Sequence, residues 1–356
     1  MTSCHGGNLL LASERLGCRP WQLLDASASL FPWSPRWLTP SHAAIRDYPD
    51  RRYISLARAI ANVHGLNQRY VLPGNGAAEL FTWAARDAAF TGLSLLPAPG
   101  FADYGRALRC WDGQLAEFSL PLDWSSAFPQ RHPILGDGEV AWICNPHNPT
   151  GQLWSRDSIV PLLQRFALVI CDEAFLPLVP YGERQSLIPL VAEHSNLVVI
   201  RSLTKLYGIA GLRLGYAVAQ PERLHRWASW RDPWPVNGVA SAVGEQLLSR
   251  PTRYKRWCSK VQRWTAIEGA WMQQQLAQLP GITPMPSATN FLLIRSNHSL
   301  VLLREALEQR HRILLRDCRS FAGLGECWLR IGLQSRRRNH RIVSALRQEL
   351  ARGVWG

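Results

Sequence analysis

A lysine that lies between two hydroxyl residues and an arginine is the first feature of this sequence that could do chemistry. Only three of the 40 basic residues are lysines, and one of them, Lys205, follows Ser202 and Thr204 and precedes Arg213. Arginine can replace lysine where only charge is needed, but its guanidinium stays protonated and forms no imine with an aldehyde. Lys205 is therefore a candidate for amine chemistry, and the hydroxyls and the arginine beside it indicate a phosphate site.

Two further polar segments follow apolar runs that are typical of buried strands. Asp172 ends one run, where a carboxylate is costly unless a cation pairs with it, and the segment 145–151, Asn-Pro-His-Asn-Pro-Thr-Gly, follows a run that ends at Cys144. Open α/β sheets bind ligands at the carboxyl ends of their strands, so we expect Asp172 and Asn148 at one edge of a sheet. An aspartate that caps the next segment is the alternative for Asp172.

A glycine turn at Gly74-Asn75-Gly76-Ala77-Ala78-Glu79 is predicted to open a helix. The first backbone N–H groups of a helix can bind an anion, so this turn is a candidate phosphate site. It matches the dinucleotide-binding fingerprint only in part, because Glu79 stands where a third glycine is needed and no clean hydrophobic strand precedes the turn. Taken alone, it is better explained as an ordinary turn.

A sheet is needed to bring these segments together, and the sequence predicts one. Short β-type runs alternate with helical patterns, which is typical of an α/β fold with a mostly parallel sheet covered by helices. The predicted strands are Val140–Cys144, Leu168–Cys171, Leu197–Ile200 and Leu214–Ala219. The predicted helices are Ile54–His64, Ala77–Phe90, Arg156–Phe166 and a long one from about Val239 to Leu279.

The last part of the chain shows a different order of elements, which predicts a second, smaller α+β domain. Its predicted elements are the strand Asn290–Arg295, the helix Leu300–Gln309, the strand Cys327–Gly332 and a terminal helix. We expect a large domain over residues 40–245 and a small domain over residues 1–39 and 246–356, joined by the long helix. A chain of 356 residues is long enough for two domains.

Composition excludes several classes of protein. With 47% hydrophobic and 19% charged residues, the chain is neither disordered nor fibrous. No apolar run approaches the roughly 18 residues of a membrane span, and the N-terminal residues do not resemble a secretory signal, so we expect a cytoplasmic protein without membrane contact. The eight cysteines show no CxxC spacing, so we expect reduced thiols and no metal site.

The net charge of +14 leaves nucleic-acid binding open as an alternative, because a basic surface attracts phosphates without a particular motif. The charge is spread thinly, however. Lys255 and Lys260 stand among arginines in a polar stretch, and the run Arg336-Arg337-Arg338 leads into an amphipathic helix. We interpret these residues as solvated surface and expect no nucleic-acid partner.

The order of Asn148, Asp172, Lys205 and Arg213 resembles that of the fold-type I pyridoxal-phosphate enzymes, the aspartate aminotransferase superfamily. The resemblance spans nearly the whole chain. It implies a large domain with a mostly parallel seven-stranded sheet, a smaller α+β domain, pyridoxal 5′-phosphate as cofactor and a homodimer. It also implies that Lys205 binds the cofactor aldehyde and later moves protons, while Asp172 pairs with the pyridine nitrogen.

The same resemblance assigns further residues to the cofactor. Asn148 would donate to the phenolate oxygen of the ring, Phe101 would stack on the ring face, and Tyr48 would reach the phosphate from the neighbouring subunit. The implied cofactor-binding set is Gly76, Ala77, Ala78, Phe101, Asn148, Asp172, Ser202, Thr204, Lys205, Arg213 and Tyr48.

Within the superfamily, the start His5-Gly6-Gly7-Asn8 and the segment Arg316-Asp317-Cys318 resemble the threonine-phosphate decarboxylases of cobalamin biosynthesis. This branch implies decarboxylation of a small phosphorylated amino acid, O-phospho-L-threonine, to (R)-1-aminopropan-2-yl phosphate. His5, Gly6, Arg316 and Arg330 would bind the substrate, and which arginine takes the carboxylate and which the phosphate stays open. The alternatives are an aminotransferase of the histidinol-phosphate type and a non-catalytic, basic nucleic-acid or regulatory binding protein on the same fold.

Three positions depart from the pattern of these relatives. Ser29 and Phe31 stand where that branch has two asparagines near the substrate. Phe175 stands where many aminotransferases have a tyrosine, which removes one hydrogen bond to the phenolate oxygen. The loss of that bond favours a reaction other than ordinary transamination.

Overall fold

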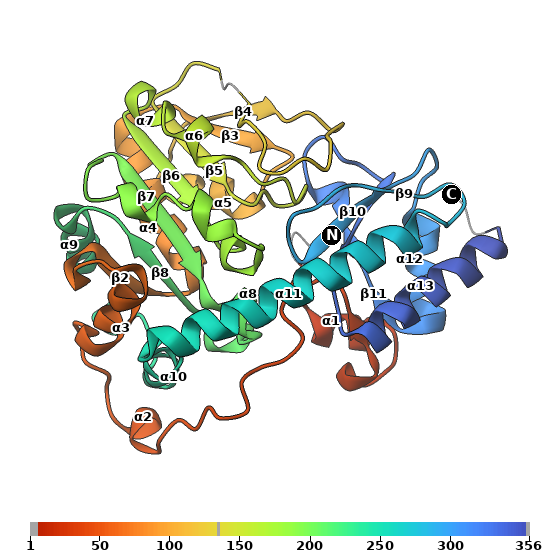
Figure 1. Cartoon of the computed structure of the whole chain (residues 1–356), viewed down its shortest axis with the longest axis horizontal. Helices are drawn as coiled ribbons and strands as arrows, with labels where there is room; N and C mark the ends of the chain where they lie inside the picture. The colour runs from red at the N-terminus through yellow and green to blue at the C-terminus, as the bar shows by residue number, and fades with distance from the viewer. Residues whose placement is uncertain (1–5, 134–135, 354–356) are drawn as a thin grey trace.

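A seven-stranded β-sheet and a four-stranded β-sheet lie side by side, and the long helix α11, Pro251–Leu276, runs from one to the other (Figure 1). The structure is a computed structural model that describes residues 6–133 and 136–353. The strands are β1 Leu24–Asp25, β2 Val71–Asn75, β3 Ser94–Ala98, β4 Leu115–Ser119, β5 Val140–Cys144, β6 Leu168–Asp172, β7 Leu197–Ser202, β8 Leu214–Val218, β9 Thr283–Pro284, β10 Phe291–Arg295, β11 Ile313–Leu314, β12 Arg316–Asp317 and β13 Trp328–Gly332. The other α-helices are α1 Leu9–Arg15, α2 Ala43–Arg46, α3 Ile54–His64, α4 Gly76–Thr91, α5 Ala102–Arg109, α6 Arg156–Ile159, α7 Leu162–Arg165, α8 Leu203–Tyr207, α9 Pro221–Trp230, α10 Gly238–Leu248, α12 Val301–His311 and α13 Arg336–Ala351.

The larger sheet has seven strands in the order β2-β8-β7-β6-β5-β3-β4. Strand β8 runs antiparallel to β2 and β7, and all other neighbouring strands pair parallel, so the predicted mostly parallel sheet is confirmed. Because β8 runs the other way, its first residues lie at the same edge as the last residues of β2, β5, β6 and β7. This edge faces the smaller sheet.

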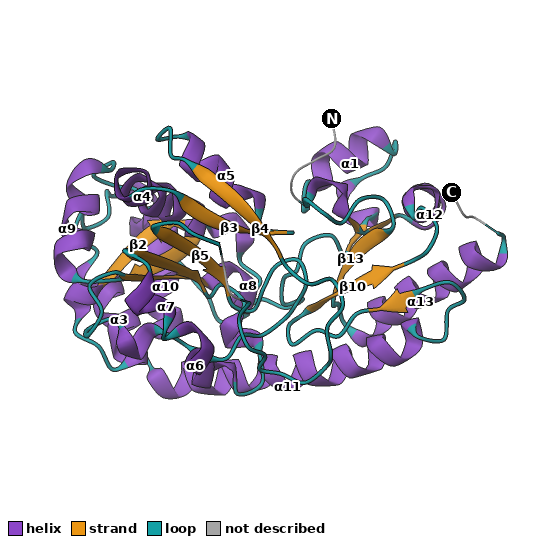
Figure 2. Ribbon diagram, turned by 90° about the horizontal axis from the view of Figure 1, so that it is seen from above, coloured by secondary structure: helices purple, strands orange, loops and turns teal. Residues whose placement is uncertain are grey.

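The central strands are buried on both faces, as their unbroken apolar sequences require. In β5, Ala141 and Ile143 pack into a core with helices α3, α10 and α11, while Val140 and Trp142 pack into a second core with α4, α5 and α9. Figure 2 shows the sheet between these two helical layers. The alternation of side chains along each strand therefore builds two cores and fixes the sheet between them.

Two predicted helices are each divided in the structure. The predicted helix Arg156–Phe166 is α6 followed by α7, with Pro161 between them, and the predicted helix Val239–Leu279 is α10 followed by α11, which begins at Pro251. Proline has no backbone N–H and its fixed φ suits the first turn of a helix. Each proline therefore ends one helix and starts the next.

The strand β2 leads directly into the glycine turn, although its sequence is not the clean hydrophobic strand of the dinucleotide-binding fingerprint. Pro73 and Gly74 make this strand hard to predict, because both residues are uncommon inside strands. The structure tolerates them because β2 lies at the edge of the sheet, where a missing N–H breaks no ladder. The turn is thus a strand-to-helix junction, with α4 beginning at Gly76.

The smaller sheet is antiparallel, in the order β12-β13-β10-β9, and helices α12 and α13 pack beside it. Near the N-terminus, β1 pairs with β11, so residues 24–25 join the C-terminal part of the chain. This pairing supports the division that we propose, with residues 40–245 as the large domain and residues 1–39 and 246–356 as the small one. No described helix is both long and apolar enough to cross a membrane.

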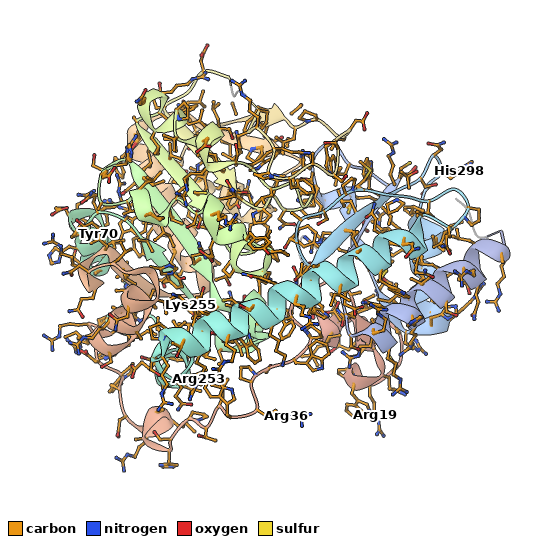
Figure 3. All side chains as sticks on the ribbon, in the orientation of Figure 1. Arg19, Arg36, Tyr70, Arg253, Lys255 and His298 are labelled. Atoms are coloured by element: carbon orange, nitrogen blue, oxygen red, sulfur yellow. The ribbon has the colours of Figure 1, made fainter. Side chains whose placement is uncertain are left out.

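The basic side chains are distributed over the surface. Figure 3 shows Arg19, Arg36 and Arg253 on different parts of the molecule, and Lys255 and Lys260 are exposed on α11.

Candidate active site

A cavity of about 480 Å³ lies where the carboxyl edge of the large sheet meets the small sheet. Most of the residues that the sequence singled out line it: Gly6, Gly76, Ala77, Ala78, Phe101, Asn148, Asp172, Ser202, Thr204, Lys205, Arg213, Arg316 and Arg330. Tyr48 does not line it, and His5 lies outside the described residues. Segments that are far apart in the sequence thus meet in one place.

Strand ends explain this convergence. Asp172 is the last residue of β6, Asn148 lies in the turn after β5, and Lys205 lies one short turn beyond the end of β7. Arg213 immediately precedes the antiparallel strand β8, which brings it to the same edge. The sheet therefore brings together four polar side chains that come from different segments of the chain.

Asp172 is buried and held from two sides. Its Oδ1 accepts a hydrogen bond from the Ala174 N–H at 2.9 Å, and its Oδ2 accepts one from the Tyr104 hydroxyl at 2.7 Å. Burial raises the pKa of Asp172 to about 6, although these two hydrogen bonds and the nearby Lys205 act in the opposite direction. The carboxylate is thus fixed in position, and a cation placed against it would gain a strong partner.

Lys205 projects into the cavity above Phe175, with Nζ 5.7 Å from the centre of the ring. Burial, together with the positive charges of Arg330 and Arg213, lowers the pKa of Lys205 to about 8. The neutral fraction of this amine near neutral pH is therefore larger than that of a free lysine, and the neutral amine is the form that attacks an aldehyde.

The N-terminus of α4 forms an anion site with residues from two other elements. The hydroxyls of Ser202 and Thr204 lie 2.7 Å apart at the start of α8, and the Arg213 guanidinium lies over Gly76. A Cβ built on Gly76 would come within 2.7 Å of an Arg213 nitrogen, and the φ of Gly76 is 73°, so only glycine fits here. Backbone N–H groups, two hydroxyls and a guanidinium together match a phosphate.

Two buried arginines face the other side of the cavity. Arg316 on β12 and Arg330 on β13 are directly opposite each other in the antiparallel pair, and they are 4% and 6% exposed. Arg330 donates to the Asn148 side chain and, at 3.1 Å, to the carbonyl oxygen of Ser27. Like charges in a cross-strand pair destabilise a sheet, so this pair is suited to a ligand that carries anionic groups.

Tyr48 lies on the surface and is 80% exposed. Its ring packs against that of Trp234, with centroids 4.4 Å apart. The Arg51 guanidinium carbon lies 4.3 Å from the centre of the Trp234 ring. The structure of one chain therefore leaves Tyr48 outside its own cavity. Among the described residues, no group of three or more His, Cys, Asp and Glu side chains could hold a metal ion.

The family model for class I and II aminotransferases matches residues 39–346. The chain belongs to the class I and II aminotransferase family. It is 35% identical to the threonine-phosphate decarboxylase of Salmonella typhimurium over 98% of this chain and 97% of that protein. It is 30% identical to the histidinol-phosphate aminotransferase of Symbiobacterium thermophilum over 90% of this chain and 88% of that protein.

The fold of this chain is also similar to that of a solved structure. The L-threonine-O-3-phosphate decarboxylase of Porphyromonas gingivalis superposes with a TM-score of 0.75 at 25% identity, over 90% of this chain and 100% of that one. The predicted fold-type I architecture is thereby confirmed.

Tyr104 is a residue of this aminotransferase-family chain to which the sequence analysis gave no role. It is buried behind Asp172, its ring lies 5.2 Å from that of Trp142, and its hydroxyl donates to the carboxylate. Its spacing from Phe101 was the available signal, because residues three apart share one face of a helix. Phe101, just before α5, thus lines the cavity, and Tyr104 in the first turn of α5 contacts the aspartate behind it.

Proposed function

We propose that this protein is a pyridoxal-phosphate enzyme that removes carbon dioxide from O-phospho-L-threonine and releases (R)-1-aminopropan-2-yl phosphate, a step of cobalamin biosynthesis. The observation that carries the proposal is the pair of buried arginines, Arg316 and Arg330, in the cavity that also holds Lys205 and Asp172. The likeness to the Salmonella typhimurium decarboxylase along nearly the whole chain supports it.

The cavity fits the cofactor on the donor set that it offers. Gly76, Ala77 and Ala78 at the start of α4, with Ser202, Thr204 and Arg213, would hold the 5′-phosphate, and Lys205 would bind the aldehyde carbon. When bound, pyridoxal phosphate supplies an electron sink for the bond that breaks at the substrate Cα. Asp172 would hold the pyridine nitrogen protonated, Asn148 would contact the phenolate oxygen, and Phe101 would cover one ring face.

The positions of the two arginines favour one assignment of the substrate groups. The carbon that carries the substrate amine must lie at Lys205, and the carboxylate is attached to that carbon. Arg330 contacts Asn148, next to the ring position, whereas Arg316 also lines a second cavity of about 470 Å³ on its far side. We therefore assign the carboxylate to Arg330 and the phosphate to Arg316, with Gly6 beside it; His5, which the sequence also assigned to the substrate, lies outside the described residues.

The choice between decarboxylation and transamination depends on orientation, because only the Cα bond perpendicular to the conjugated ring is activated. Phe175 has no hydroxyl to offer to the phenolate oxygen and packs against Phe291 with centroids 5.1 Å apart. This apolar wall beside Lys205 supports decarboxylation over transamination. The second candidate is an aminotransferase of the histidinol-phosphate type, which the relative from Symbiobacterium thermophilum favours.

Two incubations separate these functions. We expect the holoenzyme to release carbon dioxide from O-phospho-L-threonine and to form no glutamate from histidinol phosphate with 2-oxoglutarate. The first product is measured as labelled carbon dioxide and the second by a glutamate assay. Glutamate formation without carbon dioxide release would reverse the assignment, and a colourless protein that binds nucleic acid would exclude both reactions.

We also propose that the enzyme is a cytoplasmic homodimer in which Tyr48 completes the neighbouring cofactor site. Ile45 in α2 and Tyr48 just after it are both exposed, which supports a surface for a partner subunit there. The seven described cysteines are free, as is usual in a reducing compartment.

Mixed dimers test the role of Tyr48. A protomer with Lys205→Ala and a protomer with Tyr48→Ala are each expected to be impaired as homodimers. A mixed dimer should recover about half of the wild-type activity, because one of its two sites receives both an intact lysine and an intact tyrosine. If Tyr48 served its own chain, mixing would restore nothing.

A further inference from the structure

The segment 25–31 crosses from the small sheet to the reactive lysine along one wall of the cavity. The Gly332 N–H of β13 donates to Ala26 O at 2.7 Å, and the Asn290 side chain donates to Ser29 O at 3.1 Å. At its far end, the Phe31 N–H donates to Lys205 O at 3.0 Å. Backbone contacts on both sides therefore fix Ser29 between β13 and Lys205.

The Ser29 side chain is buried in the cavity without a partner. It is 2% exposed, it lines the cavity, and its Oγ makes no hydrogen bond to any described residue. Nearly all buried polar groups in proteins are hydrogen-bonded. The hydroxyl of Ser29 is therefore available to a ligand.

Ser27, two residues earlier, shows the contrast. Its Oγ donates to Asp25 Oδ1 at 2.6 Å and accepts from the Gly7 N–H at 3.0 Å, so both of its functions are used inside the protein. Both serines lie on the same wall. Only Ser29 has an unused hydroxyl.

A second unused donor lies in the same cavity. Two nitrogens of Arg330 donate to the Asn148 side chain and to Ser27 O, but its Nε has no partner among the described residues. Ser29 and Arg330 both line the cavity, and a guanidinium N–H and a hydroxyl from two such residues can both be satisfied by a single carboxylate, which offers about four acceptor sites. An anionic oxygen of a ligand would therefore satisfy both the Ser29 hydroxyl and the Arg330 Nε–H.

The carboxylate, and not the phosphate, matches the place of Ser29. Arg316, Gly6 and Gly7 line both the main cavity and the second cavity beside it, which is where a group remote from the substrate Cα would extend. Ser29 and Arg330 line only the main cavity. They are therefore on the side of the substrate carbon that Lys205 reaches.

We propose that Ser29 is a specificity-determining residue whose hydroxyl donates a hydrogen bond to the substrate carboxylate, next to Arg330. The inference rests on the proposed function, since it takes the ligand to be an amino acid.

The first test is the kinetics of Ser29→Ala, which removes the hydroxyl and little volume. A hydrogen bond to a charged group is made in the ground state and is lost as the carboxylate leaves as neutral carbon dioxide. We therefore expect KM for O-phospho-L-threonine to rise about 10- to 100-fold while kcat does not fall. The matched control is Ser241→Ala, a buried serine on α10 that bonds to Glu245 far from the cavity, and its KM should not change.

The second test uses two partial ligands with the holoenzyme and reads the change in cofactor absorbance on binding. L-threonine carries the carboxylate without the phosphate, and O-phosphoethanolamine carries the phosphate without the carboxylate. In Ser29→Ala we expect at least about tenfold weaker binding of L-threonine, unchanged binding of O-phosphoethanolamine and unchanged retention of the cofactor.

These readouts separate the two proposals. Weaker binding of O-phosphoethanolamine in Ser29→Ala would show that the hydroxyl serves the phosphate and would overturn the inference, as would unchanged binding of both ligands. A wild-type enzyme that binds L-threonine but releases no carbon dioxide from O-phospho-L-threonine would instead refute the proposed function. The effect of Ser29→Ala on L-threonine binding would then still decide the role of Ser29.

Discussion

Replacing Lys205 by alanine is expected to leave a folded protein that binds pyridoxal phosphate only noncovalently and has no measurable turnover. Lys205 is the only described lysine that lines the cavity, and the other two lysines are exposed on α11. An alanine can neither bind the aldehyde nor move a proton at the substrate Cα. The measurements are carbon dioxide release and the mass of the protein after borohydride treatment, which should show no added cofactor.

Lys255→Ala is the matched control for this variant. Lys255 lies on the exposed side of α11, and its removal takes away a primary amine without touching the cavity (Figure 3). It should behave as the wild type in both measurements. Residual turnover in Lys205→Ala close to the wild-type value, or a reduced cofactor adduct on Lys255 or Lys260, would contradict the role of Lys205.

The sequence was sufficient to predict the sheet and the residues at its edge because both depend on local patterns. Strands β5, β6 and β7 begin as short apolar runs, and in each a polar residue lies at or just after the carboxyl end. Parallel strands bring those ends together whatever the intervening sequence is. Asn148 and Asp172 could therefore be placed at one edge of the sheet from the sequence pattern, and the resemblance to the pyridoxal-phosphate enzymes added Lys205 to the same site.

Other features depend on contacts between distant segments, which no local pattern reports. The pairing of Arg316 with Arg330 follows from the register of two strands, and the unused hydroxyl of Ser29 follows from what lies around it in space. Tyr104 was visible as a residue near Phe101, but its hydrogen bond to Asp172 joins residues 68 positions apart. Proline, by contrast, was a local signal that the helix predictions over Arg156–Phe166 and Val239–Leu279 overlooked.

Asp172→Asn is expected to retain the cofactor and to lose turnover by about 10²- to 10⁴-fold. The substitution keeps the size and shape of the side chain but removes the negative charge that would pair with a protonated pyridine nitrogen. Losing one partner of a buried ion pair costs roughly 3–5 kcal/mol, which corresponds to a rate loss of that size if the charge on the ring is needed at the transition state. Lys205 and the phosphate site around Gly76 remain, so the cofactor should still bind, as its absorbance would show.

Tyr104→Phe distinguishes this loss of charge from a loss of position. The variant keeps the ring that packs on Trp142 and the Asp172 carboxylate, and it removes only the hydroxyl that donates to Oδ2. That hydrogen bond favours the charged carboxylate, so its removal raises the pKa of Asp172. We expect a much smaller loss of turnover than in Asp172→Asn, and an acid limb of the pH–rate profile that moves to higher pH. Unchanged turnover in Asp172→Asn would show that another group holds the pyridine nitrogen, and a loss in Tyr104→Phe as large as that in Asp172→Asn would show that the placement of the carboxylate matters more than its charge.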